Sequence, residues 1–234
     1  MSLKNLVTVV MQSNGWADPV SQVSSSTDPN IKQAMSLANK ALQSLCFSKA
    51  WPELIIPYTF NTVVGQDTYP LPVDFHHIIV NTVWDQTDYY ELRGNLRPDE
   101  WVRYQLNLVP LFTGYRLYPR NKTFRILPVP TSVATMVFEY YTKNLVLPAD
   151  GGAPQPVYSQ DDDTSIIDET LVELGLTWRW RQKKGLDYSA EVAEYQGTID
   201  QRYAQEIALD DLPVGIVDHP TPLTDGYLGP NYNW

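Results

Sequence analysis

Two long stretches with the periodicity of amphipathic helices, joined by one short turn, constrain the fold of this chain more than any other feature. They lie between Thr164 and Leu209, and their apolar residues recur every three or four positions, which places the side chains on one face of an α-helix. In the first stretch these residues are Ile167, Leu171, Leu174 and Trp178, and in the second they are Tyr188, Val192, Tyr195, Ile199, Tyr203 and Ile207. Apolar faces of about five turns each must be buried, so the sequence predicts a helical hairpin that packs against other parts of the chain.

The predicted ends of this hairpin carry residues that favour helix termini. The acidic residues 161–163 precede the first helix, and Ser165 and Asp168 have the spacing of a capping box, so we expect that helix to begin before Asp168. Gly185 can adopt the left-handed conformation that ends a helix. Asp187 is then a suitable N-cap for the second helix.

Two more helices are predicted before residue 50. Ser2 can cap the first, and Asp28 followed by Pro29 forms an N-cap and first-turn pair for the second. Cys46, the single cysteine, lies beside the apolar face of the second helix. We interpret it as a small buried apolar residue, because the sequence shows neither a histidine partner nor an electropositive niche for a reactive thiol. One cysteine allows no internal disulfide and is typical of a reducing compartment.

Between Trp51 and Val146 the pattern changes from helical to extended. β-branched and aromatic residues gather in six segments separated by Gly, Pro and Asn, and each segment is predicted to form a strand. The segments are residues 55–64, 78–85, 89–93, 115–118, 123–127 and 135–143. Pro98 and the two acidic residues after it predict one short helix that ends before Pro110, and residues 119–122 have the length of a hairpin turn.

These patterns predict an α+β fold, in which a helical bundle built from N- and C-terminal helix pairs carries an inserted antiparallel β region. The expected division is residues 1–50 and 160–209 for the discontinuous bundle, 51–147 for the β region with its short helix, 148–159 for a connector, and 210–234 for an extended C-terminal arm. The arm contains four prolines and three glycines, which exclude a helix or a central strand. Its aromatic residues are unusual for a merely solvated tail.

The composition favours contacts with protein over contacts with nucleic acid or membrane. A net charge of −10 argues against a surface that gains affinity by neutralising phosphates. Charged residues make up 19% of the chain and aromatic residues 12%, and a surface poor in charge and rich in Tyr and Trp is typical of protein interfaces. No apolar run of 18 residues occurs, so we expect neither a membrane span nor a signal peptide.

Few residues stand in arrangements typical of catalysis or metal binding. The histidines are His76, His77 and His219, and no nucleophile elbow, phosphate-binding loop or zinc-protease helix is present. His76 and His77 would point to opposite faces of a strand, so we expect no metal between them. Residues 161–163 lack the glycine and the distal glutamate of a calcium loop and are interpreted as an acidic lead into a helix. We therefore predict no catalytic residue, no metal and no cofactor.

Several short sequence motifs follow one another in a characteristic order along residues 28–209. They are Tyr69-Pro70-Leu71-Pro72-Val73-Asp74-Phe75, Val83-Trp84-Asp85, Leu92-Arg93-Gly94, Trp101, Gly175-Leu176-Thr177-Trp178-Arg179-Trp180 and Lys184-Gly185-Leu186-Asp187-Tyr188. In this order they resemble the head-to-tail adaptor proteins of short-tailed bacteriophages, a group similar to tail tubular protein A. The turn Arg120-Asn121-Lys122 departs from the family pattern, which includes a glycine there.

The resemblance implies a structural, non-enzymatic protein of the virion neck or tail that assembles in the host cytoplasm. It implies a homododecameric ring that joins the portal protein to the tail nozzle protein and continues the DNA channel, without specific DNA binding and without a membrane. We expect the channel wall to be net negative, with contributions from Asp161, Asp162 and Asp163 or from Glu206, Asp210 and Asp211. We also expect the C-terminal arm to dock on the portal or on a neighbouring subunit through Tyr227, Leu228, Tyr232 and Trp234.

Two functions of other classes remain open at this stage. Paired carboxylates in the β region, with Glu91, Asp99 and Glu139 as candidates, would suit a phage cell-wall or capsule hydrolase, because the fold and not the sequence sets the spacing of such a pair. A carbohydrate-binding β module would need exposed, coplanar Trp or Tyr side chains.

Overall fold

The computed structural model describes residues 1–16, 18–106, 113–118 and 120–210. Its helices are α1 (Leu3–Ser13), α2 (Pro29–Ser48), the 3-10 helix η1 (Pro52–Leu54), α3 (Pro98–Gln105), α4 (Glu169–Lys183) and α5 (Ser189–Asp210). Its strands are β1 (Ile55–Asn61), β2 (Thr68–Pro70), β3 (Phe75–Ile78), β4 (Trp84–Asp85), β5 (Tyr90–Glu91), β6 (Gly114–Tyr118), β7 (Thr123–Leu127), β8 (Thr135–Thr142), β9 (Val146–Leu147) and β10 (Thr164–Ser165). The predicted mixed α+β class is confirmed.

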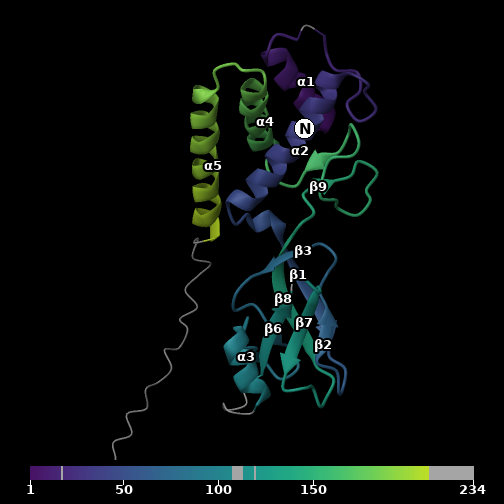
Figure 1. The fold of residues 1–234 in the computed structure, drawn as a ribbon, viewed down its shortest axis with the longest axis vertical. Coiled ribbons are helices and arrows are strands. Elements are labelled where there is room, and N and C mark those ends of the chain that lie inside the picture. Colours follow the sequence, from purple (N-terminus) through teal and green to yellow (C-terminus); the bar gives the residue numbers. More distant parts are fainter. Residues whose placement is uncertain (17, 107–112, 119, 211–234) are drawn as a thin grey trace, which may run out of the picture.

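The helices and the main sheets occupy opposite ends of the molecule (Figure 1). Helices α1, α2, α4 and α5 gather at one end, which we call the helical part, and β1–β8 with α3 form the other end, which we call the β part. In the helical part α4 packs against α1, α2 and α5. No helix among the described residues is both long and apolar enough to cross a membrane.

The cores of the two parts are separate clusters of buried side chains. In the helical part Leu42 of α2, Leu171 of α4 and Ile199 of α5 belong to one cluster. In the β part the ring of Phe124 stacks on that of Phe138, with centroids 5.5 Å apart, and so joins the two sheets. The helical periodicity in the sequence therefore marks the faces that pack, since Leu171 and Ile199 belong to the predicted apolar stripes.

Most of the predicted helix ends are confirmed by hydrogen bonds. The side chain of Ser2 accepts from the N–H of Asn5, and that of Asp28 accepts from the N–H of Asn30 at 2.7 Å. At the end of α4, Gly185 has a φ of +72°, and its N–H donates to a carbonyl of the preceding turn at 3.2 Å. This glycine ends α4 as the sequence predicts, because a residue in the left-handed conformation allows N–H groups after the helix to donate to its last carbonyl groups.

The predicted start of the first long helix is wrong. Thr164 and Ser165 belong to β10, which pairs antiparallel with β9, and α4 begins only at Glu169. Asp168, which the sequence suggested as the second member of a capping box, is itself the N-cap and accepts from the N–H of Thr170 at 2.9 Å. Pairing with β9 commits the backbone of residues 164–165 to a strand, so the capping box with Ser165 cannot form.

The β part contains two antiparallel sheets. One has the strand order β1-β8-β4-β5, with β3 also paired to β8, and the other has the order β2-β7-β6.

The predicted strand over residues 78–85 is instead two short strands, β3 and β4, separated by a turn in which Asn81 has a φ of +66°. The sequence did not predict β2, β9 or β10. The predicted hairpin between β6 and β7 is confirmed, with Tyr118 opposite Thr123 and Lys122 at a φ of +51°.

Candidate assembly surfaces

The acidic segment 161–163 forms hydrogen bonds with segments of the helical part that are distant in sequence. The carboxylate of Asp161 accepts from the N–H of Ser24 at 2.7 Å and from that of Val23 at 3.1 Å. Its backbone carbonyl accepts from the N–H of Lys4 at 2.9 Å. Burial raises the pKa of this carboxyl, but the hydrogen bonds from Ser24 and Val23 outweigh that effect and leave the pKa below its usual range. Asp161 therefore connects the segment to α1 and to the loop before α2.

Asp163 is fully buried and organises its own loop. One carboxylate oxygen, Oδ2, accepts from the N–H groups of Ser159 and Gln160 at 2.7 and 2.8 Å and from the side chains of Ser159 and Gln155 at 3.1 Å each. Its backbone carbonyl accepts from the N–H of Leu3 at 2.9 Å. Among the three aspartates only Asp162 is exposed, so Asp162 is the one side chain of this segment that is free to face a channel.

The other predicted site residues fall at or beyond the end of α5. Glu206 and Asp210 lie within the bounds of α5, but their side chains are outside the described part of the chain. The remaining residues predicted for the channel wall and the docking arm also lie outside the described residues, namely Asp211, Tyr227, Leu228, Tyr232 and Trp234.

Helix α5 presents an acidic surface. It contains five acidic residues and one basic residue, Arg202. Of the side chains described in this helix, Glu194 and Asp200 are exposed, together with small and amide residues such as Ala193 and Gln201. In Figure 1 α5 lies at the outer edge of the helical part, and among the helices it packs mainly against α4. Among the described side chains of α5, Glu194 and Asp200 supply exposed negative charge, although Asp200 pairs with Lys49 at 3.0 Å. The one basic residue of the helix, Arg202, lies 3.8 Å from Asp168.

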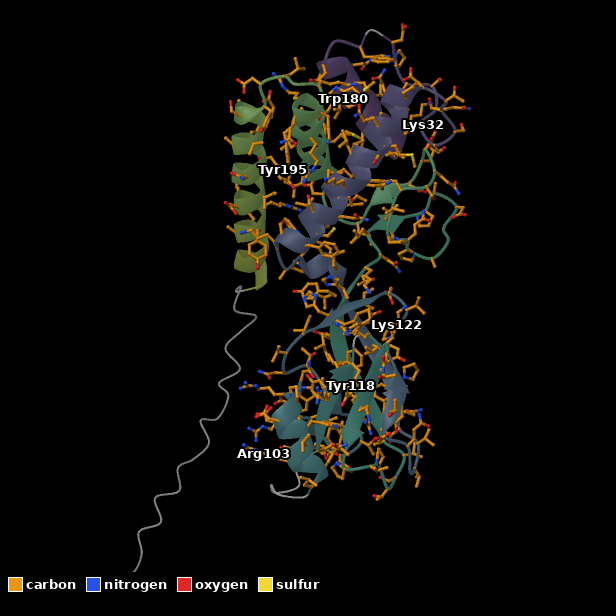
Figure 2. All side chains as sticks on the ribbon, in the orientation of Figure 1. Lys32, Arg103, Tyr118, Lys122, Trp180 and Tyr195 are labelled. Atoms are coloured by element: carbon orange, nitrogen blue, oxygen red, sulfur yellow. The ribbon has the colours of Figure 1, made fainter. Side chains whose placement is uncertain are left out.

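Basic residues concentrate instead in the β part, within residues 93–125. This stretch contains seven Arg or Lys residues and two acidic ones, while the rest of the chain contains ten basic and 25 acidic residues. We define the basic face as Arg103, Arg116, Tyr118, Lys122 and Arg125. Figure 2 shows Lys122, Tyr118 and Arg103 following one another along the β part. The sequence analysis did not identify this basic cluster, which a count of charges in successive windows would have revealed.

The prediction that His76 and His77 point to opposite faces is wrong. Their Nδ1 atoms lie 2.5 Å apart, because the register of β3 on β8 shifts between Phe75 and His77 and breaks the strict alternation of sides. The ring of His76 stacks on Phe47 at 4.7 Å and that of His77 on Tyr141 at 4.4 Å. Burial lowers the pKa of both imidazoles, and the charges of His77 and Lys143 lower that of His76 further.

The histidine pair borders a cavity of about 310 Å³ between the two parts, which Cys46 also lines. Cys46 is buried, as predicted, and burial raises the pKa of its thiol to about 12. Across residues 1–16, 18–106, 113–118 and 120–210 no group of three or more His, Cys, Asp or Glu side chains is placed to hold a metal ion.

The carboxylates considered for hydrolysis come from three different elements. Glu139 is on β8, Glu91 is on β5, with β4 between them in the sheet, and Asp99 is on α3, where it lies 3.8 Å from Arg97. The carboxylates that do share a cavity are Asp85 and Asp88, which line a space of about 210 Å³ with Tyr90.

Asp85 is almost completely buried, and its Oδ1 accepts from the N–H groups of Thr87 at 2.7 Å and of Asp88 at 3.1 Å, so it stabilises a turn. The exposed aromatic residues nearest in sequence are Trp84, Tyr89 and Tyr90.

A family model described as "SU10 adaptor protein" matches residues 2–218, which is nearly the whole chain and includes both the helical part and the β part. No curated protein matches.

Proposed function

This chain belongs to the SU10 adaptor protein family and is thus a phage adaptor, and from that premise we propose that it forms a ring that joins the portal to the tail nozzle of a short-tailed phage. The ring would contain twelve copies, as in the head-to-tail adaptors similar to tail tubular protein A. The family match supports the adaptor role and a place in the virion. The observation that best supports the ring is the acidic free face of α5.

We propose that this face of α5 lines the channel. DNA can move through a channel whose wall carries negative charge, because such a wall offers few cations that would hold the phosphates. Glu194 and Asp200 are exposed on α5, with Asp200 paired to Lys49, whereas the carboxylates of Asp161 and Asp163 accept backbone N–H groups inside the subunit. Of the two alternatives predicted for the acidic channel wall, we therefore favour the one on α5, which also contains Glu206 and Asp210.

A closed ring requires each subunit to offer different faces to its two neighbours. We propose that residues 1–50 and 160–209 act as one discontinuous helical bundle, that the β region 51–147 acts as a second unit, and that residues 148–159 connect them. The helical part, with its acidic α5, and the β part, with its basic face, differ in charge, which supports contacts between unlike surfaces.

Mixing the purified protein with a matching portal ring tests ring formation. We expect light scattering and negative-stain microscopy to show a ring on the portal, even if the free protein is a monomer, because the portal can act as a template. A protein that stays monomeric in the presence of the portal would contradict the proposal.

Charge reversal on α5 tests the channel wall. A Glu194→Lys/Gln201→Lys variant adds cations to the exposed face of the helix, so its portal-bound rings should retain duplex DNA at moderate salt, while wild-type rings should not. Glu53→Lys/Gln66→Lys adds the same charge at exposed positions outside α5 and is the matched control. Equal DNA retention by both variants would show that α5 does not face the channel.

We further propose that the C-terminal segment docks on the portal or on a neighbouring subunit. Buried Tyr and Trp anchors typically cost at least about 2 kcal/mol of binding free energy when truncated, and a ring multiplies this through avidity. Deletion of residues 210–234 should leave the midpoint of thermal unfolding nearly unchanged and weaken capture by portal rings in a pull-down. Undiminished capture of the truncated protein would exclude the docking role.

A structural adaptor needs no catalytic residue, and the family match supports a non-enzymatic role. A zymogram on host peptidoglycan is the direct check. Clearing that disappears after alanine replacement of Glu91, Asp99 or Glu139 would favour the hydrolase instead.

A further inference from the structure

Two arginines of the basic face lie opposite each other on neighbouring strands. Arg116 of β6 and Arg125 of β7 are partners in register, and both side chains point to the side away from the buried Leu117 and Phe124. Arg125 forms an ion pair with Asp67. Arg116 lies over the ring of Tyr118 at 4.9 Å, and no carboxylate of the described residues comes within 4.0 Å of its guanidinium. Like charges directly opposite each other destabilise a sheet. Asp67 compensates the charge of Arg125, so Arg116 is the cation of this pair that favours an additional anionic partner.

Aromatic rings lie beneath these cations. The guanidinium of Arg125 lies 5.6 Å from the ring of Trp101 and 6.0 Å from that of Tyr118, and the two rings meet edge to face at 6.4 Å. Trp101 is the buried residue of α3, while Arg103 of the same helix and Lys122 of the hairpin are exposed. Trp101 supports Arg125 from below, and the half-buried ring of Tyr118 is the aromatic group of this face that a ligand can reach. A surface that combines exposed cations with such a ring suits a ligand that carries both carboxylates and apolar or aromatic groups.

The C-terminal segment 211–234 has this chemistry. It contains three carboxylates, from Asp211, Asp218 and Asp225, and no Lys or Arg. It also contains two tyrosines and a tryptophan after position 226. The segment follows α5, whose last turn lies, in the view of Figure 1, on the same side of the molecule as α3. An extended chain of 24 residues spans up to roughly 80 Å, which is ample for a return to the β part.

We propose that in the free protein the segment 211–234 binds the basic face of its own chain. Tethering supplies the ligand at an effective concentration of about millimolar, so even weak charge pairing and ring contacts would keep the face occupied. A DNA backbone could pair with the same cations, but DNA lacks the tether that keeps the segment close to the face. The inference rests on the docking role proposed above and adds a regulatory step, in which the portal or a neighbour displaces the segment from the basic face.

Paramagnetic broadening in the full-length chain tests this contact. An Asn233→Cys variant carries one spin label near the end of the segment, because the only native thiol, Cys46, is buried. Amide signals of β6, β7 and α3 should broaden at low salt and recover at about 0.5 M salt, where the Debye length falls to about 4 Å. Broadening that is absent, or that falls mainly on the helical part, would overturn the proposal.

A matched pair of charge reversals locates the surface. Arg103→Glu/Arg116→Glu should abolish the broadening, while Lys32→Glu/Lys40→Glu, on the exposed side of α2, should leave it intact. Unchanged broadening in the first variant would overturn the proposal, and the salt experiment on the otherwise native chain covers the case in which that variant fails to fold.

Two further measurements separate the alternatives. In a mixture of isotope-labelled chain and spin-labelled chain we expect no broadening, and its appearance would assign the contact to a neighbouring copy and overturn the intrachain proposal. Duplex DNA should not compete with the segment, and loss of broadening on adding DNA would identify the face as a nucleic-acid surface instead. These experiments use no portal, so their failure is distinguishable from failure of the ring or of portal docking.

Discussion

Replacing Gly175 and Gly197 with alanine, one at a time, measures the contribution of the close approach between α4 and its neighbours. Both glycines lie in helix interiors, where alanine is favoured over glycine by about 0.5–1 kcal/mol. At Gly197 an added Cβ would meet no atom within 4 Å, so Gly197→Ala should realise the full gain in stability.

Gly175 has the same backbone preference but no free space. An added Cβ would lie 3.2 Å from Cε2 of Tyr195, 3.3 Å from Cβ of Ala41 and 3.3 Å from Nη1 of Arg179. These atoms belong to α5, α2 and α4, and Arg179 is itself held there, since its Nη1 donates to the carbonyl of Gly175 at 2.8 Å. Overpacking of this kind costs about 1–3 kcal/mol, so Gly175→Ala should range from neutral to about 2 kcal/mol destabilising.

The difference between the two variants is the quantity to measure. The free energies of unfolding should differ by about 1–3 kcal/mol, which corresponds to midpoints that differ by about 2–12 °C for a domain of this size. Thermal and urea unfolding of both variants, followed by circular dichroism in one buffer, provides the comparison. If Gly175→Ala is as stable as Gly197→Ala, the three-helix contact tolerates a methyl group and the reasoning fails.

Two further perturbations address the loop and the histidine pair. Asp163→Ala removes the acceptor of two backbone N–H groups and should lower the free energy of unfolding by about 2–4 kcal/mol. Asp162→Ala, at an exposed position, should change the free energy of unfolding by no more than about 0.5 kcal/mol, as measured by urea unfolding. Similar losses in both variants would contradict the role assigned to Asp163. The pKa values of His76 and His77 are lower in the folded state than the ordinary value of 6.5, so the unfolded chain takes up protons first. The stability that the two neutral imidazoles contribute should therefore be fully present above about pH 6.5 and be lost as the pH falls below it. The His76→Gln/His77→Gln variant should show a weaker pH dependence of the unfolding midpoint over this range. An unaltered pH dependence would show that other groups cause it.

The sequence by itself determined those features that depend on neighbouring residues. Helical periodicity located the buried faces of α4 and α5, and Ser2, Asp28 and Gly185 marked helix ends, because capping joins groups within a few positions of one another. The β6–β7 hairpin was predictable for the same reason, since a short turn sets the register of the strands that it joins. The ordered motifs pointed to a head-to-tail adaptor, and the family match confirms a phage adaptor.

Only the tertiary structure decided what the individual polar residues do. Asp163 looked like a surface acid but is buried among donors from its own loop, and the strand β10 forms because residues 146–147 are available as a partner. A register shift on β8 turned His76 and His77 toward each other. Arg116 and Arg125 face each other because of strand pairing, and Asp67, 58 positions from Arg125, supplies its carboxylate. Such contacts depend on which distant segments the fold places side by side, and local periodicity does not indicate which segments these are.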